Sequence, residues 1–259
     1  MKRQRVAIGE QLKGCPQVIT LGLRSQLTDY TRAERELLRT ADIIFYPTDR
    51  FVDLFATLGK ETFPSLNCYR LSGNRLKQTS LLRLINAPHP KTRVYFGHRQ
   101  KQNILQDFRF PLVVKKPRDA SNGNHVFFVN HREKLDWYNQ NFNPAYIQEY
   151  VAAEQQLRVV VLNYHTVFGY QRPLTKEGFV DTSASWGAWR LDEVDAEAVE
   201  LARNIARDGN LSDVAVDMVF DGSNYWVLEL NFHYEESDLQ QPGLDRTRLI
   251  IEMIEKGDL

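Results

Sequence analysis

Two stretches in the C-terminal part of the chain decide the fold: VAVDMVF at residues 214–220 and YWVLELN at residues 225–231, joined by the turn sequence DGSN. Apolar runs on either side of an Asp-Gly turn predict an antiparallel β-hairpin. Asp217 lies in the first strand, and Glu229 and Asn231, two residues apart, lie on one face of the second. Because a buried carboxylate costs free energy unless it is paired or bound to a metal, these side chains form a candidate Mg²⁺ site.

The hairpin places a geometric condition on this candidate metal site. Asp217 stands opposite Glu229 only if the connection holds an odd number of residues, such as 222–224 or 221–225. A two-residue loop would place the two carboxylates on opposite faces. A second interpretation is that both carboxylates pair with Arg or Lys side chains at the edge of the core. The pattern alone leaves both interpretations open.

The composition is that of an ordinary globular chain: 259 residues with 33 basic and 33 acidic side chains. A net charge of zero argues against a general nucleic-acid binder, which needs a basic surface. No apolar run approaches the ~18 residues of a membrane span, and the basic start MKRQR lacks the apolar core of a secretory signal. Two cysteines exclude a disulfide scaffold and a four-cysteine zinc site. We therefore expect a cytoplasmic protein without nucleic-acid or membrane partners.

The N-terminal part alternates strand and helix patterns, which predicts a small α/β unit with parallel pairing. Thr31 followed three residues later by Glu34 is the capping-box pattern of a helix start. The expected strands and helices in this part are 17–21, 31–39, 42–46, 51–58 and 76–85. The sequence NAPHP at 86–90 ends the last helix, because its two prolines favour extended backbone, so the first domain is predicted to span residues 1–87.

The rest of the chain predicts an α+β arrangement with mostly antiparallel pairing, divided into a unit at 88–150 and a unit at 151–259. The expected strands are 92–96, 112–116, 126–129, 145–151, 157–162, 165–171, 214–220 and 225–230. The expected helices are 99–108, 131–141, 194–207 and 245–255.

Two further stretches have the chemistry of a ligand site. Lys115 and Lys116 end an apolar strand and point to opposite faces, so one amine points inward. The polar loop that follows contains Ser121 and Gly123 and offers small side chains and backbone N–H groups to a phosphate. The extended segment YIQEYV at 146–151 has backbone groups that can meet an adenine edge. A surface lysine pair and an ordinary edge strand are the alternative interpretations.

Taken in order, these features resemble the ATP-grasp superfamily and, within it, the RimK-like carboxylate–amine ligases. The matching segments are FPLVVK (110–115) with the loop after it, YIQEYV (146–151), LRVV (157–160), VFGY (167–170), VDM (216–218) and LELN (228–231). The resemblance covers roughly residues 75–235. It implies an α+β fold in which a small N-terminal α/β domain precedes two α+β subdomains, whose antiparallel sheets enclose a nucleotide cleft.

The resemblance also implies a reaction and roles for individual residues. ATP with Mg²⁺, or Mn²⁺ in its place, would activate a carboxylate as an acyl phosphate, which an amine of an amino acid or peptide would attack. Lys115 and Arg158 would be the catalytic cations, on the α/β- and γ-phosphates respectively, with Lys116 the alternative to Lys115. The metal ligands would be Asp217, Glu229 and Asn231. The other nucleotide contacts would be Ser121, Gly123, Gln148, Glu149, Val151 and Gln156.

Several residues depart from the family pattern or extend it. The phosphate loop has few glycines, Gln156 stands where an Asp is common, and Thr182 stands where an Asn is common. These departures support an alternative, a nucleotide-binding protein without ligase activity that has a regulatory or assembly role. An unrelated α/β protein with structural ion pairs is the third hypothesis.

Candidate substrate residues are Arg172, Arg190 and His233, and a homo-oligomer is expected on general grounds.

Overall fold

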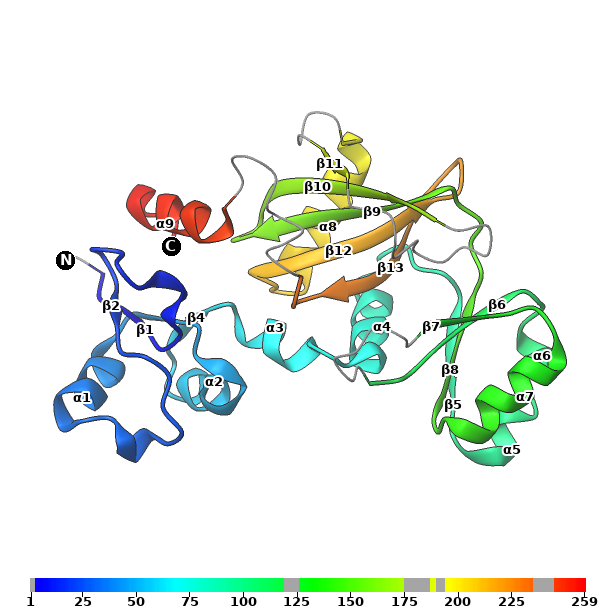
Figure 1. The fold of residues 1–259 in the computed structure, drawn as a ribbon, viewed down its shortest axis with the longest axis horizontal. Coiled ribbons are helices and arrows are strands. Elements are labelled where there is room, and N and C mark those ends of the chain that lie inside the picture. Colours follow the sequence, from blue (N-terminus) through cyan, green and yellow to red (C-terminus); the bar gives the residue numbers. More distant parts are fainter. Residues whose placement is uncertain (1–2, 119–125, 175–186, 190–193, 235–244) are drawn as a thin grey trace.

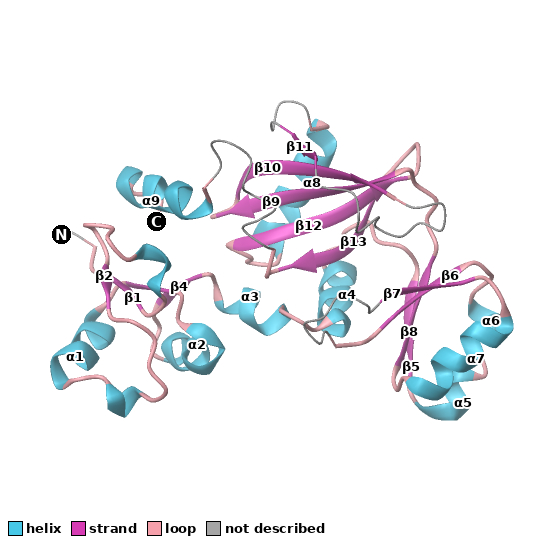
Figure 2. Ribbon diagram, in the orientation of Figure 1, coloured by secondary structure: helices cyan, strands magenta, loops and turns pink. Residues whose placement is uncertain are grey.

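The computed structural model describes residues 3–118, 126–174, 187–189, 194–234 and 245–259. Three sheets follow one another along the chain, and helices cover them (Figures 1 and 2). One sheet is parallel and two are antiparallel, as the sequence predicts for an α/β domain followed by two α+β subdomains. No helix of the described residues is long and apolar enough to cross a membrane.

The N-terminal domain is a four-stranded parallel sheet in the order β2-β1-β3-β4. Its elements are β1 (Arg5–Ala7), β2 (Ile19–Thr20), α1 (Arg32–Thr40), β3 (Ile43–Phe45), α2 (Thr48–Thr57) and β4 (Glu61–Phe63), with 3-10 turns at Glu10–Leu12 and Leu27–Asp29. The predicted capping box is confirmed: Glu34 N donates to Thr31 Oγ1 at 3.2 Å, and Thr31 N donates to Glu34 Oε2 at 2.6 Å. These bonds satisfy backbone groups that a helix start leaves open.

The central subdomain is an antiparallel sheet in the order β5-β8-β6-β7. Its elements are β5 (Thr92–Tyr95), α5 (Gly97–Lys101), α6 (Ile104–Asp107), β6 (Leu112–Lys115), β7 (Val126–Val129), α7 (Arg132–Asn141) and β8 (Ala145–Glu149). The prediction of one helix over 99–108 is wrong, because the chain forms two short helices there. Asn103 N donates to Gln100 O at 3.0 Å, a tight turn that interrupts the α-helical pattern between them.

The C-terminal subdomain is an antiparallel sheet in the order β11-β10-β9-β12-β13. Its elements are β9 (Gln155–Leu162), β10 (His165–Pro173), β11 (Gly187–Trp189), α8 (Ala196–Asp208), β12 (Asp213–Phe220), β13 (Tyr225–Asn231) and α9 (Arg246–Lys256). The turn between β9 and β10 is Asn163-Tyr164, as predicted, and both residues have positive φ, 45° and 64°. Two such residues give the twist that a two-residue hairpin requires.

The two faces of the C-terminal sheet are buried by different parts of the chain. Alternate valines of β9 separate them: Val159 and Val161 pack with α8, and Val160 packs with α9 and the N-terminal sheet. Two helices, α3 (Leu66–Leu71) and α4 (Arg75–Leu84), lie between the N-terminal and central parts (Figure 1). Because Leu71 and Leu82 belong to the same apolar cluster as α8, both helices pack on the C-terminal sheet.

Candidate active site

The hairpin of β12 and β13 brings the two predicted carboxylates together. Asp217 lies directly opposite Glu229 in the strand pairing. The expected odd-numbered connection is wrong: the strands are joined by the four residues between Phe220 and Tyr225. A β-bulge corrects the register instead, since Asp217 pairs with Glu229 but Met218 pairs with Val227, which leaves Leu228 as an extra residue. The bulge therefore has the effect on register that the sequence analysis assigned to the turn.

Asp217 is held by an arginine of the neighbouring strand. Arg158 of β9 is the residue opposite Asp217 on the other side of β12. Arg158 Nε donates to Asp217 Oδ1 at 2.6 Å and Nη2 donates to Oδ2 at 2.9 Å. Both residues are buried, with 8% and 4% of their surface exposed. This is the two-pronged geometry that gives an arginine–carboxylate pair its strength.

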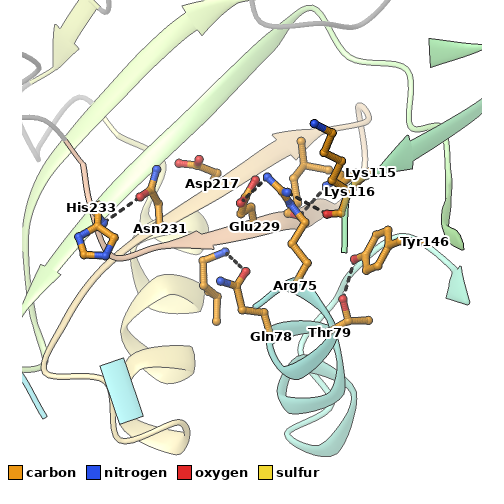
Figure 3. Close-up of polar contacts among 12 residues, drawn as sticks. Arg75, Gln78, Thr79, Lys115, Lys116, Tyr146, Asp217, Glu229, Asn231 and His233 are labelled. Carbon is orange, nitrogen blue, oxygen red and sulfur yellow. Dashed lines mark hydrogen bonds and ion pairs between the residues drawn. The ribbon is translucent and has the colours of Figure 1, made fainter. Parts of the chain in front are cut away.

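Glu229 is held by an arginine from a distant part of the chain. Arg75 Nη2 donates to Glu229 Oε1 at 3.0 Å, and Arg75 Nη1 donates to the carbonyl of Lys116, also at 3.0 Å (Figure 3). Arg75 thus joins helix α4, the central subdomain and the metal-candidate strand. Arg75 is not among the site residues that the sequence predicts. One feature of the sequence could have indicated it. Arg75 is the first residue of a helix, where a positive charge is unfavourable because of the helix dipole, so its presence there suggests a contact with a more distant part of the chain.

The carboxylates and Asn231 have the donor chemistry of a magnesium site. Asn231 lies two residues beyond Glu229 on the same strand, and its Oδ1 accepts from His233 N at 3.1 Å. All three donors are hard oxygens, which Mg²⁺ prefers. A carboxylate has about four lone-pair sites, so two bonds from Arg158 do not exhaust Asp217. Among the described residues, no group of three or more His, Cys, Asp or Glu side chains is arranged to hold a metal ion, so a site here depends on the Asn231 amide as third ligand.

The two lysines at the end of β6 have different surroundings. Lys115 is only 4% exposed, and its Nζ donates to the carbonyl of Leu228, the extra residue of the bulge, at 3.0 Å. The Lys115 ammonium group therefore links the central subdomain to the C-terminal subdomain at the residue that precedes Glu229. Lys116 is half-buried, and its Nζ lies 5.6 Å from the centre of the Phe142 ring. The geometry favours Lys115 as the amine closer to the candidate metal ligands.

Tyr138 of α7 fixes the backbone at Lys115. Its hydroxyl donates to Lys115 O at 2.6 Å and accepts from Tyr146 N at 3.0 Å, with all of these atoms buried. The Tyr146 hydroxyl in turn is hydrogen-bonded to Thr79 Oγ1 of α4 at 2.6 Å (Figure 3). Burial raises the pKa of both tyrosine hydroxyls, so each keeps its proton at neutral pH.

Replacing Tyr138 by Phe should destabilise the protein by about 2 kcal/mol, because it leaves a buried N–H and a buried carbonyl without their partner. The measurement is the free energy of unfolding in urea. The matched control is Tyr150→Phe: Tyr150 contacts Phe128 through its ring, and its change should stay within about 0.5 kcal/mol. Equal losses in the two variants would show that the Tyr138 hydroxyl has no special role.

The predicted adenine segment lies at the end of β8. Gln148 is buried, and its Nε2 donates to Thr92 Oγ1 at 3.0 Å, so its side chain belongs to the sheet. Glu149 N donates to Lys91 O at 2.8 Å, and Val151 follows the end of the strand. Gln156 in β9 is 6% exposed, and its Oε1 is buried without a hydrogen-bond partner among the described residues. A buried polar atom of this kind is unusual and fits a position that meets a ligand.

The remaining predicted residues are placed only in part. Ser121, Gly123, Thr182 and Arg190 lie outside the described residues. Arg172 lies in β10, opposite Gln156 of β9. His233 is exposed, and its Nε2 is hydrogen-bonded to Ser72 Oγ at 2.8 Å, which places it beside α3 rather than at the two arginine–carboxylate pairs.

Comparison with known proteins gives consistent results. The chain is 22% identical over 214 residues to the coenzyme γ-F420-2:α-L-glutamate ligase of Methanocaldococcus jannaschii, a match that covers 79% of this chain and 73% of that protein. A RimK-domain ATP-grasp protein of Sphaerobacter thermophilus has a TM-score of 0.66 at 18% identity, covering 96% of this chain and 98% of the other. The ATP-grasp ligase PsnB, solved with minimal precursor, Mg and ADP, has a TM-score of 0.69 at 12% identity, covering 98% of each chain.

A larger relative in the fold is an N5-carboxyaminoimidazole ribonucleotide synthetase solved as an ADP complex, with a TM-score of 0.62 at 12% identity. The match covers 90% of this chain and 64% of that one, so the chain spans about two thirds of its length. The sequence profile of the RimK-like ATP-grasp domain matches residues 72–254, which is most of the chain and includes both arginine–carboxylate pairs. The protein is therefore a member of the RimK-like ATP-grasp family and an ATP-dependent ligase.

Proposed function

We propose that the protein joins a carboxylate to an amine in two steps, with ATP and Mg²⁺. In the first step a carboxylate oxygen attacks the γ-phosphorus of ATP, the bond to the bridging oxygen breaks, and ADP leaves. In the second step the amine nitrogen attacks the acyl carbon of the acyl phosphate, the bond to the phosphate oxygen breaks, inorganic phosphate leaves and the nitrogen loses a proton. Mn²⁺ has the same preference for oxygen ligands and is expected to replace Mg²⁺.

The observation that carries the proposal is the grouping of opposite charges from five elements, β6, β9, β12, β13 and α4. Asp217 and Glu229 lie on neighbouring strands and pair with Arg158 and Arg75, and the Lys115 ammonium donates to the carbonyl of Leu228, the residue before Glu229. Without a ligand each arginine compensates the charge of its carboxylate, and the Lys115 ammonium is bonded to a neutral carbonyl. A nucleotide bound with its metal ion has negative phosphates and a positive metal. The phosphates can pair with the cations of the protein, and the metal can bind the carboxylates. The same side chains can therefore exchange partners without leaving a buried charge alone.

The proposed roles follow from this arrangement. Bound Mg²⁺ would neutralise phosphate charge, and Asp217, Glu229 and Asn231 are the residues that would hold it. Lys115 would hold the α/β-phosphates, and Arg158 would stabilise negative charge on the transferred group. The catalysis would consist of positioning and charge neutralisation, since phosphoryl transfer needs little covalent chemistry from the protein.

The other proposals concern context. The substrates are proposed to be an amino acid or peptide carboxylate and an amine, because a glutamate ligase and a ligase bound to a peptide precursor are among the relatives. A cytoplasmic location is proposed from the ATP requirement and from two buried free cysteines, Cys15 and Cys68. The proposed functional units are residues 1–87, 88–150 and 151–259.

The two lysines can be separated by their effect on ATP binding. Lys115→Met should raise the Kd for ATP with Mg²⁺ at least about tenfold, because it removes a buried charge-assisted phosphate contact. Lys116→Met should change that Kd less than about threefold, because its ammonium lies over the Phe142 ring instead. Isothermal titration calorimetry measures both, and thermal unfolding checks that each variant is folded. A larger effect at Lys116 would reverse the assignment.

The overall function is tested by ADP release. The protein, ATP and Mg²⁺ are incubated with pairs drawn from a panel of amino acids and short peptides, and ADP and inorganic phosphate are measured together. The proposal expects both products in equal amounts, and a condensed product in mass spectrometry, for at least one pair. Tight ATP binding without ADP formation for any pair would instead support the nucleotide-binding alternative.

A further inference from the structure

Strand β13, which contains two of the three candidate metal ligands, is the last strand of the described C-terminal sheet. An edge strand leaves a row of backbone N–H and C=O groups without strand partners. Groups from outside the sheet bond to part of this row. Val227 N donates to Pro88 O at 2.9 Å, Leu228 O accepts from Lys115 Nζ at 3.0 Å, and Leu230 N donates to Gln78 Oε1 at 3.3 Å. The backbone around the candidate ligands is therefore held on its outer side as well as by β12.

The direction of the candidate ligands depends on the bulge in this strand. Val227 packs into the apolar cluster around α8, and in a regular strand Glu229 and Asn231 would point to the same side. Leu230 packs into that cluster instead, because the extra residue Leu228 shifts the alternation by one. Without the bulge, Glu229 would face apolar side chains, where a carboxylate is costly. The two ligands therefore need a strand that keeps its irregular pairing.

Gln78 of α4 bonds to the backbone between these two ligands (Figure 3). Its side chain is 3% exposed, and both ends of its amide are used: Nε2 donates to Leu71 O at 3.0 Å, and Oε1 accepts from Leu230 N. Leu230 lies directly between Glu229 and Asn231 in the sequence. Because a carbonyl needs a donor and an N–H needs an acceptor, these two partners fix which end of the amide points toward β13.

The packing of α4 does not explain a glutamine at position 78. Leu82, four residues further along the helix, lies on the same face and packs into the apolar cluster around α8. An apolar side chain at position 78 would continue this face, whereas a buried amide costs free energy unless its polar atoms are hydrogen-bonded. The feature of Gln78 that needs an explanation is therefore its amide, and the bond to Leu230 N is the contact by which this amide reaches the candidate site.

The bond from Lys115 to the same strand differs in kind from the bond of Gln78. The Lys115 ammonium is proposed to bind phosphate, so its contact with Leu228 O would be exchanged when a nucleotide enters. Gln78 carries no charge for a phosphate or a metal, and both ends of its amide already have partners. Its bond to Leu230 N would therefore persist while the charged groups change partners. Gln78 is thus placed to support the strand with and without a ligand.

We propose that Gln78 is a positioning residue of the ligase. Its amide holds the backbone between Glu229 and Asn231 and so keeps both side chains directed to the divalent ion, while Gln78 itself touches neither the metal nor the nucleotide. The inference rests on the proposed function for the role of the two ligands, and on the two hydrogen bonds of Gln78 for their support.

The test is the variant Gln78→Met, which keeps the length of the side chain and removes both hydrogen bonds. With ADP present it should raise the Kd of Mn²⁺ at least about tenfold, as the loss of an outer contact of a metal site does. EPR measures free Mn²⁺ directly, with the same ADP concentration in every sample and a blank without protein. In leucine-labelled protein, NMR should show that the Leu230 amide hydrogen exchanges at least about tenfold faster, while Leu162 of the inner strand β9 changes less than about threefold.

The matched control is Tyr30→Phe in the N-terminal domain. Tyr30 is 1% exposed, and its hydroxyl donates to Gly22 O at 2.8 Å and accepts from Arg24 N at 3.2 Å, so this variant also removes one donated and one accepted bond to the backbone. It should lose stability in urea as Gln78→Met does, but leave the Kd of Mn²⁺ within about twofold, because it lies far from β13. A second variant, Gln78→Glu, keeps an acceptor for Leu230 N and loses the donor to Leu71 O. It should lose stability yet keep the Kd of Mn²⁺ within about threefold.

An equal rise of the Mn²⁺ Kd in Gln78→Met and Tyr30→Phe would overturn the inference, and so would a Kd that follows the loss of stability in Gln78→Glu. The wild type provides a test that needs no variant to fold: exchange of the Leu230 amide hydrogen as fast as at an open strand edge would also overturn it. The two proposals fail separately. Absence of Mn²⁺ binding by the wild type with ADP refutes the proposed metal ligands, whereas normal binding by the wild type and an unchanged Kd in Gln78→Met refute only the role of Gln78.

Discussion

Glu229→Gln is expected to lower ADP formation about a hundredfold or more while the protein stays folded. The substitution keeps the size of the side chain and an oxygen for Arg75, but removes the negative charge that a divalent metal needs. Loss of a preorganised electrostatic contact at a reacting centre costs about 10²–10³ in rate. The measurement is ADP release at saturating ATP, with the Mg²⁺ concentration varied.

The control for Glu229→Gln is Glu133→Gln, the same change at a side chain that is 85% exposed on α7. It should keep full activity. A Glu229→Gln enzyme that retained more than about a tenth of the wild-type rate at ordinary Mg²⁺ would contradict the assignment of Glu229 as a metal ligand. The Arg75–Glu229 pair would then have a structural role, the second interpretation of these carboxylates.

Arg158→Met should destabilise the protein by about 4 kcal/mol, because it leaves the buried Asp217 carboxylate without its cation. For a chain of this size the loss corresponds to a decrease in Tm of about 10 °C. Thermal and urea unfolding measure the change. The double variant Arg158→Met, Asp217→Leu should regain most of the stability, because replacing both members removes the unpaired charge.

An exposed pair provides the comparison for Arg158→Met. Arg93 Nη1 lies 2.7 Å from Asp107 Oδ2, with the Arg93 side chain 59% exposed, so Arg93→Met should cost less than about 1 kcal/mol. Similar costs for Arg158→Met and Arg93→Met would mean that water reaches Asp217 in solution. Failure of the double variant to regain stability would mean that Arg158 contributes mainly through packing rather than charge.

The sequence predicted the two hairpins because these depend on local alternation and turn chemistry, whereas it gave the placement of Asp217 opposite Glu229 only as conditional on the length of the connection. The bulge at Leu228 could not be predicted from the sequence. Leucine is common in regular strands, so the residue itself does not mark a bulge. The extra residue depends on the pairing with β12 and on the contact with Lys115. Asp217 therefore lies opposite Glu229 because of the bulge, and not because of the length of the turn.

Arg75 escaped prediction for a different reason. Its carboxylate partner is 154 residues away, and the contact exists only because α4 packs on the C-terminal sheet. Local periodicity contains no information about such a contact. The sequence left cationic pairing of Asp217 open as one of two interpretations, but Arg158 as the partner follows only from the pairing of β9 with β12 in the structure.

Helix α4 contacts the C-terminal subdomain partly through apolar packing and the central subdomain through polar contacts. Its Leu82 packs into the C-terminal apolar cluster and Gln78 accepts from Leu230 N at 3.3 Å, whereas its links to the central sheet are polar: Arg75 to Lys116 O and Thr79 to Tyr146. If the central sheet rotates outward to admit a nucleotide, these polar links break first. Helix α4 would then travel with the C-terminal sheet, and Arg75 would stay on Glu229 throughout the opening.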